Sequence, residues 1–365
     1  MLEDFIYDYA GYISIFLLFF FMLLTIPVFV SMGLAAFIAA LLIEDPFLAF
    51  KTLVNTAWQG ASIFELVALP LFIFTGTIMQ RTDAGRDLFE GIIIPPSIPL
   101  ILYGVITETS IGQLFIGGVI PGMIMMSAFM AYVFLSRPAV RVVHTMPLRQ
   151  RVNTTFSSLG VVILPLVIIV AIYTGIFTPT EVGALSVLYV AGLGLLQGRL
   201  NLAKLKAAAL AATATTSMLF MLIVFGQYFA HFLTFEQVPQ SIAGAIIDNA
   251  SGIWAITLII LTYVVLGMFL ESAAMLLISI PIFFPVAMEL GMDPVAFGIF
   301  AAIAMEIAQI SPPIGVNLFT IHGISKISLW KLARGAFPFL LIQIAMLYLV
   351  YFFPEVVTWL PGQMK

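Results

Sequence analysis

Six long stretches of this sequence carry no charged residue, and they restrict the possible folds more than any other feature. They lie between Asp8 and Glu44, Glu108 and Arg137, Arg151 and Glu181, Lys206 and Glu236, Asp248 and Glu271, and Arg334 and Glu355. About 20 apolar residues are enough for a helix to cross a bilayer, so each stretch can hold at least one crossing. The sequence therefore predicts an all-α membrane protein with several crossings.

The composition agrees with this prediction. The 365 residues are 62% hydrophobic and 9% charged, whereas soluble domains carry about 25% charged residues. No cysteine is present, which excludes disulfides and thiolate metal sites, and the net charge of -4 gives no sign of nucleic-acid binding. The first residues are acidic rather than basic, which is not typical of a signal peptide. Pro27 is expected to divide the apolar run from Tyr9 to Ile43 into two parts.

The sequence also contains an internal repeat. The Pro-Pro pair at Pro95 recurs at Pro312, an offset of 217 residues. The same offset relates Gly118 to Gly335 and Pro121 to Pro338. We therefore predict two related halves, with chance repetition of Pro-Gly turns as the alternative.

Basic residues are distributed oppositely in the two halves. The stretch Arg137–Arg151 holds four arginines, whereas its counterpart after Tyr351 has no basic residue until the C-terminal Lys365. The turn after the first Pro-Pro segment has no Lys or Arg, but the second turn is followed by Lys326, Lys331 and Arg334. Arg81 and Arg86 likewise have no basic counterparts. Because Lys and Arg favour the cytoplasmic side, we predict inverted halves, with the Arg137–Arg151 loop inside and the segment after Tyr351 outside. Inverted repeats with interrupted helices indicate a secondary transporter.

The Pro-Pro pairs are expected to unwind two helices near mid-membrane. Unwound backbone is tolerated there only where it is buried or lines a polar cavity. Its carbonyls can bind a cation, and the ends of the half-helices can face an anion. The polar neighbours Ser97, Ser311 and Asn317 favour this interpretation over two simple proline kinks.

A second polar position lies at Glu271 and Ser272, inside a long apolar stretch. An intramembrane carboxylate is a candidate functional group. Small residues nearby suit a tight tip, so we predict a helix pair from Ile253 to Met288 whose turn, near Leu270 to Ala274, stays within the membrane. An ordinary crossing that ends at Glu271 is the alternative.

Two further glutamates stand close to apolar segments. Glu306 either supports the broken segment or pairs with a nearby backbone group. Glu181 suits the positive N-terminal end of a helix that Thr178 or Thr180 caps.

Other function classes find little support. The histidines are too scattered for a transition-metal site, no phosphate-binding glycine loop occurs, and no catalytic cluster is visible, so the chain is not expected to be an enzyme. An ion channel remains an alternative, because channels also use broken helices.

Several motifs resemble one family in order along the chain. They are GIIIPPSIPLILYGVITETSIGQLFIGGVIPG, GIFTPTEVGALSVLY, GMFLESAAMLLISIPIFFP and ISPPIGVNLFTIHGISK. All four resemble the large membrane subunit of tripartite ATP-independent periplasmic (TRAP) transporters.

The resemblance implies an elevator-type, ion-transporter-like fold with two broken helices and two re-entrant hairpins. It implies sodium-coupled import of an organic anion, such as a C4-dicarboxylate, sialic acid or another sugar acid, across the bacterial inner membrane. A periplasmic binding protein and a small four-helix membrane subunit are the implied partners, and sodium ions are the only implied cofactor. By resemblance, the second-half cation site comprises Gly267, Ser272, Ser311, Pro312 and Gly315, with Asn317 and Glu271 as helpers. The first-half site retains Pro95, Pro96 and Ser97.

The chain departs from the family between Glu90 and Gly91. Gly76 matches Gly226 at an offset of 150, but after Gly91 the offset is 217. The first half is therefore short by the difference, 67 residues, which suits one helix and one hairpin. An inactive transporter remnant is the resulting alternative.

We predict scaffold helices in 1–90, a truncated transport part in 91–136, a basic loop in 137–157, further scaffold in 158–249, and the second transport part with the C-terminal helix in 250–365.

Overall fold

The computed structural model describes residues 2–82, 97–136, 163–249, 252–267, 270–311 and 315–364, and the regular elements in these ranges are helices. Some sequence predictions fall outside the described residues. They concern Pro95, Pro96, Pro312, the junction of Glu90 with Gly91, and the Arg137–Arg151 loop.

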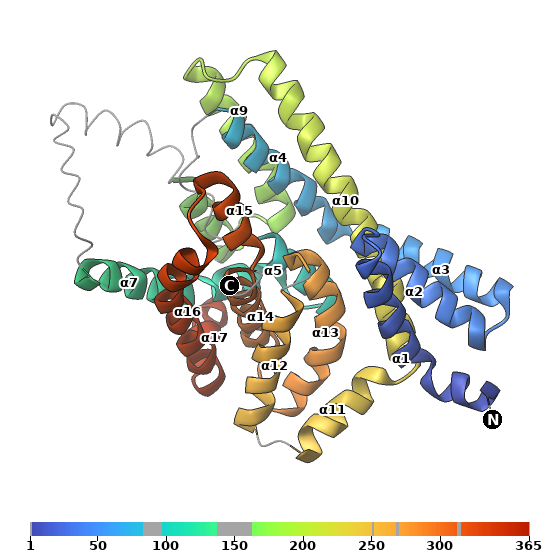
Figure 1. Ribbon diagram of the computed structural model, residues 1–365. Coiled ribbons are helices and arrows are strands. Elements are labelled where there is room, and N and C mark those ends of the chain that lie inside the picture. Colours follow the sequence, from blue (N-terminus) through green and yellow to red (C-terminus); the bar gives the residue numbers. More distant parts are fainter. Residues whose placement is uncertain are drawn as a thin grey trace.

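The helices follow one another along the chain as Figure 1 shows. The first half contains α1 Leu2–Leu23, α2 Val28–Ile43, α3 Pro46–Ala61, η1 Phe64–Val67, α4 Ala68–Arg81, α5 Ile98–Thr107, α6 Ile111–Gly117 and α7 Val119–Ser136. The second half begins with an apolar helix at Ile163–Tyr173. It continues with α9 Pro179–Leu196, α10 Leu202–Phe235, α11 Val238–Asn249, α12 Gly252–Leu266, α13 Ser272–Glu289, α14 Pro294–Ile310, α15 Val316–Ser325, α16 Leu329–Phe352, α17 Glu355–Thr358 and η2 Pro361–Gln363.

Several of these helices have the length and composition of membrane crossings. Within the described ranges they are Phe64–Arg81, Ile111–Ser136, Pro179–Leu196, Leu202–Phe235, Ser272–Glu289 and Leu329–Phe352. The longest, α10, has 34 residues and a length of about 50 Å. It therefore exceeds the hydrocarbon core of a bilayer, which is about 30 Å thick. The predicted all-α, multi-pass membrane fold is confirmed.

Pro27 divides the first apolar run, as predicted. α1 ends at Leu23, Thr25 takes a left-handed φ of 63°, and Pro27 is the N-cap of α2. Proline lacks a backbone donor but suits the start of a helix, where that donor would have no partner. The two resulting helices pack against each other.

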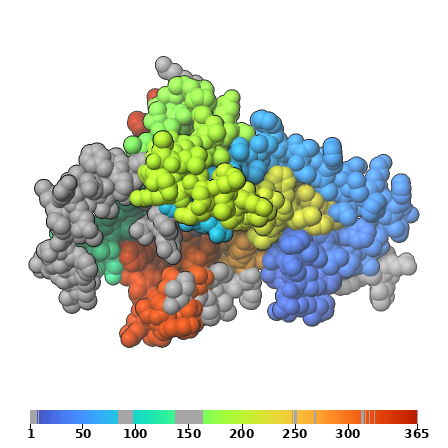
Figure 2. Space-filling view, turned by 90° about the horizontal axis from the view of Figure 1, so that it is seen from above, coloured from blue at the N-terminus to red at the C-terminus, as the bar shows by residue number. Residues whose placement is uncertain are grey.

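The long helix α10 packs against α2, α3 and α4, while α9 packs against α4. Two glycines 150 positions apart make these contacts close. Gly33 of α2 faces the ring of Phe225 on α10, and Gly183 of α9 faces Leu71 and Phe72 on α4. Each half thus packs one helix, α2 or α9, against a helix of the other half, α10 or α4. This exchange agrees with the predicted inverted repeat, which would relate the two halves by a two-fold axis. Seen from above, the N-terminal helices (blue) and α15 (orange-red) lie on different sides of the molecule (Figure 2).

α12 and α13 form the predicted helix pair, but the turn lies earlier than expected. It connects Leu266 to Ser272, whereas Ala273 and Ala274 belong to the first turn of α13. Glu271 takes an extended conformation as the N-cap, with φ −75° and ψ 165°. Alanine is the best helix former, so the two alanines continue the helix instead of shaping the tip. The hairpin packs against α5, α10 and α14.

The repeat is visible in local structure. α5 and α15 occupy matching places, and each is followed by a left-handed residue, Glu108 with φ 55° and Lys326 with φ 58°. A serine N-cap follows two residues later in both cases, at Ser110 and Ser328. The backbone therefore repeats while the charge in the turn reverses.

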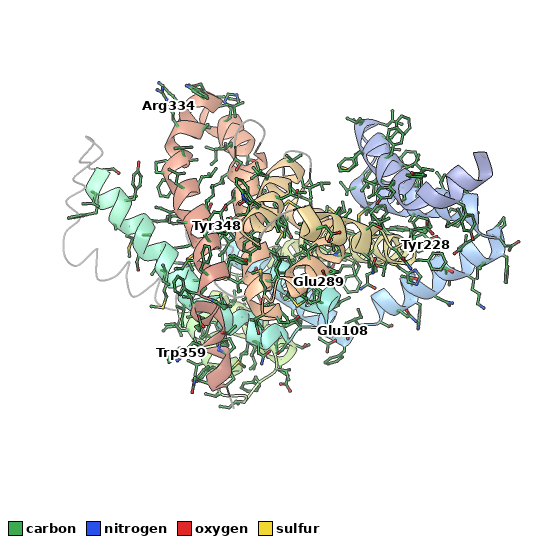
Figure 3. All side chains as sticks on the ribbon, turned by 90° about the horizontal axis from the view of Figure 1, so that it is seen from below. Glu108, Tyr228, Glu289, Arg334, Tyr348 and Trp359 are labelled. Carbon is green, nitrogen blue, oxygen red and sulfur yellow. The ribbon has the colours of Figure 1, made fainter. Side chains whose placement is uncertain are left out.

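The next helix differs between the halves. In the first half it is divided at Gly118 into α6 and α7, whereas in the second half α16 runs on past the internal Pro338. Arg334 lies near one end of α16 and Trp359 beyond the other end (Figure 3).

The structure shows what the shortened first half lacks. Glu90 corresponds to position 240 by the offset of 150, and Gly91 corresponds to position 308 by the offset of 217. The unmatched positions 241–307 hold most of α11, the whole α12–α13 hairpin and all but the last turn of α14. The first half therefore lacks counterparts of one hairpin and of the first part of its broken helix.

Candidate cation and substrate site

The site predicted in the second half lies where the α12–α13 hairpin meets the interruption between α14 and α15. α14 ends at Ile310 and α15 begins at Val316. Ser311 is extended, with φ −77° and ψ 130°, so the helix is interrupted here as the sequence predicted. An interrupted helix exposes backbone groups that a continuous helix would use internally.

Gly267, just after α12, lies directly against Ala308 of α14. A Cβ placed at Gly267 would overlap the Ala308 methyl group and would lie 3.0 Å from its Cα. Any side chain here would push the hairpin away from α14. Glycine is therefore required for the close approach of the two segments.

Ser272, the first residue of α13, is joined to the same helix end. The Gln309 side-chain amide donates a hydrogen bond to the Ser272 hydroxyl. Gln309 is only 7% exposed and Ser272 is half-buried, so this bond is shielded from solvent. The structure thus places two predicted site residues, Gly267 and Ser272, against the last turn of α14.

Ser311 and Gly315 bound the interruption in the described chain. The buried Ser311 hydroxyl donates to the Ile307 carbonyl at 2.6 Å, and the Gly315 amide donates to the Ser311 carbonyl at 3.0 Å. A Cβ on Gly315 would run into the Gln309 carbonyl oxygen and would lie 3.0 Å from the Ser311 carbonyl oxygen. Only glycine lets the chain return so close to two carbonyl oxygens, which are suitable ligands for a hard cation.

The remaining second-half residues lie at the edges of this region. Asn317 is half-buried in the first turn of α15, and Glu271 is exposed at the hairpin tip. Glu306 is half-buried in α14, one turn before Ile310. Pro312 lies outside the described residues. Across the described part of the chain, no three His, Asp or Glu side chains gather in a way that could hold a metal ion, so oxygens of backbone and hydroxyl groups are the candidate ligands.

The first-half site is represented by Ser97 alone, because Pro95 and Pro96 lie outside the described residues. Ser97 is the N-cap of α5 and is 2% exposed, yet its hydroxyl has no hydrogen-bond partner among the described residues. A buried polar group without a partner is costly. α5 itself is tied to the second half, because the Tyr103 hydroxyl donates to the Pro294 carbonyl at 2.6 Å.

Sequence reasoning missed Gln309 and Ala308. A signal for Gln309 was present, since it is an amide in the otherwise apolar end of AIAMEIAQI, two residues before Ser311. Ala308 gave no signal, because an alanine in an apolar helix is indistinguishable from its neighbours. The predicted cap at Thr178 is confirmed: it forms a reciprocal capping box with Glu181.

The sequence profile described as "Tripartite ATP-independent periplasmic transporter, DctM component" matches residues 15–92 and 89–356. The two matched pieces meet at the place where the repeat offsets put the missing segment. The two matches together cover nearly the whole chain, so the chain belongs to this family.

Among similar proteins is the C4-dicarboxylate TRAP transporter large permease protein DctM of Pseudomonas aeruginosa, which is 38% identical over 277 residues. That match covers 74% of this chain and 65% of the relative. The sialic acid TRAP transporter large permease protein SiaM of Vibrio cholerae is 33% identical over 282 residues, covering 74% of this chain and 64% of the relative. The matched region thus spans less than two thirds of both relatives.

The ectoine/5-hydroxyectoine TRAP transporter large permease protein UehC of Ruegeria pomeroyi matches over a longer range. It is 29% identical over 411 residues, with 93% of this chain and 96% of the relative covered. The alignment is therefore longer than the aligned part of this chain by about 70 positions (411 against 93% of 365). This agrees with the shortfall of 67 residues found from the repeat.

Among solved structures, the Alcanivorax borkumensis YdaH transporter, described as having an unusual topology, superimposes with a TM-score of 0.55. The match has 13% identity and covers 93% of this chain and 98% of that chain. It supports the fold.

Proposed function

Because this chain belongs to the DctM-component family of tripartite ATP-independent periplasmic transporters, we propose that it is a large membrane permease subunit that moves an organic anion inward with sodium. The contact between the hairpin and the end of α14 is the observation that carries this proposal. There, Gly267 permits contact with Ala308, and Gln309 orients Ser272. These contacts bring polar groups from two segments together inside an apolar region.

A sodium ion bound here would take its oxygen ligands from both segments. The Ser272 hydroxyl comes from the hairpin, and the carbonyls of Gln309 and Ser311 come from the interruption. Oxygen ligands of this kind suit hard cations. Because neither segment offers all the oxygen ligands that sodium needs, binding would stabilise the contact between the two segments. Asn317 and Glu271, at the edges of the site, would support the ligands.

The substrate of this proposal is a carboxylate-bearing organic anion. C4-dicarboxylates, sialic acid and ectoine, which are named for the relatives, all carry a carboxylate group. The chain has only 14 Lys and Arg residues, and none is in α12, α13 or α14. The attraction would come from bound sodium and from the N-termini of α13 and α15, each equivalent to about half a positive charge.

Two partners complete the proposed system, namely a periplasmic binding protein and a small membrane subunit. The family description includes the words tripartite and periplasmic. The proposed location is the bacterial inner membrane, where a periplasmic protein can reach the outer face of the chain.

Thermal unfolding of the purified chain in sodium chloride and in choline chloride of equal ionic strength tests the cation site. A ligand at 100 times its dissociation constant stabilises a protein by about 2.7 kcal/mol, so sodium should raise the melting temperature and choline should not. Ser272→Ala should reduce this sodium effect. Ser136→Ala is the matched control, because the Ser136 hydroxyl donates to the Tyr132 carbonyl within its own helix.

Two results would contradict the proposal. One is equal stabilisation by the two salts, and the other is an unchanged sodium effect in Ser272→Ala.

An inactive remnant is the second candidate function. The observation that favours it is the missing counterpart of positions 241–307, which includes the first-half hairpin. Sodium binding without sodium-driven uptake, measured with both partners present, would select this candidate.

A further inference from the structure

A cavity of about 520 Å³ lies between the α12–α13 hairpin and the helices α1, α10 and α11. Figure 1 shows α11 running from the end of α10 towards the start of α12, so this helix closes one side of the space. The volume falls within the range of about 300–1,000 Å³ that is typical of small-molecule sites. It is therefore large enough to hold a ligand and exceeds an ordinary packing defect.

The cavity wall offers almost nothing to a polar ligand. Its described side chains are uncharged, and all are apolar except Thr262 and Ser279. The Thr262 hydroxyl donates to the Leu258 carbonyl at 2.9 Å, and the Ser279 hydroxyl donates to the Tyr263 hydroxyl at 2.8 Å. Both donors are thus used within the protein. Because a hard cation needs several oxygen ligands and a buried water needs two or more polar partners, the cavity selects an apolar occupant.

One end of the cavity is buried and the other is a rim between α11 and α12. The buried end is formed by Leu18, Phe229 and Leu233, which are fully buried. At the rim, Leu258 of α12 is 44% exposed, and Ala245 of α11 is exposed as well. α10 and α13 are candidate membrane crossings, and α1 and α12 are shorter apolar helices. Because such helices form the walls, the rim opens to the hydrocarbon part of the bilayer.

We propose that this cavity binds one acyl chain of a membrane phospholipid, which enters between α11 and α12 and extends to the buried end. A water molecule takes about 30 Å³, and a methylene group is of similar size. The cavity of about 520 Å³ therefore has room for roughly 17 methylene groups. This is the size of one phospholipid chain and too small for two. A bound chain also supplies the dispersion contacts that the walls of an empty cavity lose.

The proposed lipid site is separate from the candidate cation site. None of the described residues assigned to the cation site lines the cavity, although Leu266, which does, directly precedes Gly267. A lipid chain here contacts α1 and α10 on one side and the hairpin on the other. It therefore fills the space beside the hairpin without competing with sodium, and the inference goes beyond the proposed transport function.

The test uses the full chain in nanodiscs made of phosphatidylethanolamine and phosphatidylglycerol. A small share of the phosphatidylethanolamine carries a diazirine on one acyl chain, and mass spectrometry locates the residues that it labels after illumination. Label is expected on Leu18, Phe229 or Leu233, because lipid around the protein cannot reach fully buried residues. Leu210 on α10 is 63% exposed and serves as the internal reference for surrounding lipid.

Ala245→Phe should obstruct the rim, because it places an aromatic ring where the chain enters. Labelling of the buried end, relative to Leu210, should fall about tenfold or more. Ala214→Phe is the matched control, since Ala214 is also an exposed alanine in an apolar helix but does not line the cavity. Its labelling pattern should equal that of the wild type.

Leu233→Trp should fill the cavity from its buried end and give an equally large loss of label on Leu18 and Phe229. Its melting temperature, measured without added lipid in detergent, should equal or exceed that of the wild type, because the larger side chain enters existing space. A lower melting temperature would mean that the ring is overpacked and that the space is absent.

Three further results would overturn the inference. The first is label confined to exposed residues, and the second is unchanged labelling of the buried end in Ala245→Phe. The third is a difference of about tenfold or more when phosphatidylglycerol carries the diazirine chain instead, because the uncharged wall should not distinguish head groups. The readout is lipid labelling alone, so these results are separate from any failure of sodium binding or sodium-coupled uptake.

Discussion

The Gln309 side chain donates a hydrogen bond to the hydroxyl of Ser272, and this bond joins the end of α14 to the start of α13. The two residues are 37 positions apart in the sequence. Ser272 belongs to the hairpin and Gln309 to the interrupted helix. Because the bond is shielded from solvent, a substitution in either the hairpin or the interrupted helix should destabilise the contact between both segments.

Gly267→Ala should weaken this contact. The new methyl group would overlap Ala308, and overpacking of this kind costs about 1–3 kcal/mol. Chemical unfolding in detergent measures the loss, and sodium-dependent stabilisation should fall with it. Gly335→Ala in α16 is the control, because within the described part of the chain its Cβ would meet no atom of another segment within 4 Å. Equal stability of the two variants would show that the hairpin does not pack closely on α14.

The glycines between the two halves should show a graded response to alanine. At Gly33 a Cβ would lie 3.0 Å or less from three carbons of the Phe225 ring, whereas at Gly183 the nearest atom is the Leu71 Cβ at 3.2 Å. Gly33→Ala should therefore cost about 1–3 kcal/mol and Gly183→Ala about 1 kcal/mol or less.

Gly192→Ala completes this series. Gly192 lies in the same helix as Gly183, but a Cβ there would meet no other segment within 4 Å among the described residues, so the new methyl group should stabilise α9 by up to about 1 kcal/mol. Unfolding free energies that do not follow the order Gly33, Gly183, Gly192 would contradict the proposed packing between the halves.

Thr178→Ala should destabilise the start of α9. The Thr178 hydroxyl accepts from the Glu181 amide, and the Glu181 carboxylate accepts from the Thr178 amide at 2.8 Å. Loss of an N-cap costs about 1 kcal/mol. Thr174→Ala is the control, since the Thr174 hydroxyl donates to backbone carbonyls of its own helix. A cost below that of the control would mean that the cap adds no stability.

Single cysteines should reveal the inverted topology, because the chain has no cysteine of its own. Thr145→Cys lies in the basic loop, and Thr358→Cys lies in α17 beyond the end of α16. A membrane-impermeant thiol reagent added to intact cells should label Thr358→Cys alone. Labelling of Thr145→Cys at the same rate would place both segments on one side and refute the inversion.

Insertion of the missing segment should increase transport. A chain with the related hairpin segment inserted between Glu90 and Gly91 gains the first-half hairpin and the first part of the broken helix. With the small subunit and the binding protein present, its sodium-dependent uptake of a labelled dicarboxylate should exceed that of the 365-residue chain. A scrambled insert of the same length and composition is the control. Equal, robust uptake by the unmodified chain would show that one hairpin is sufficient.

The amino-acid sequence alone determined the class of the protein, the repeat and the position of the missing segment. These features depend on local properties: charge-free runs long enough for a bilayer, prolines that break helices, and two offsets that differ by 67. The helix boundary at Pro27 and the cap at Thr178 are equally local, since each depends on residues within one or two turns.

Only the tertiary structure decided which groups meet. No sequence pattern distinguishes Ala308 from the other alanines of its helix. Its role arises from the contact that α14 makes there with Gly267 of the hairpin. Gly76 of α4 and Gly226 of α10 are likewise alike in the sequence, where both are glycines in apolar helices. Only the structure shows that Leu277 of α13 covers Gly226. Packing depends on distances between segments far apart in the chain, and no local pattern encodes those distances.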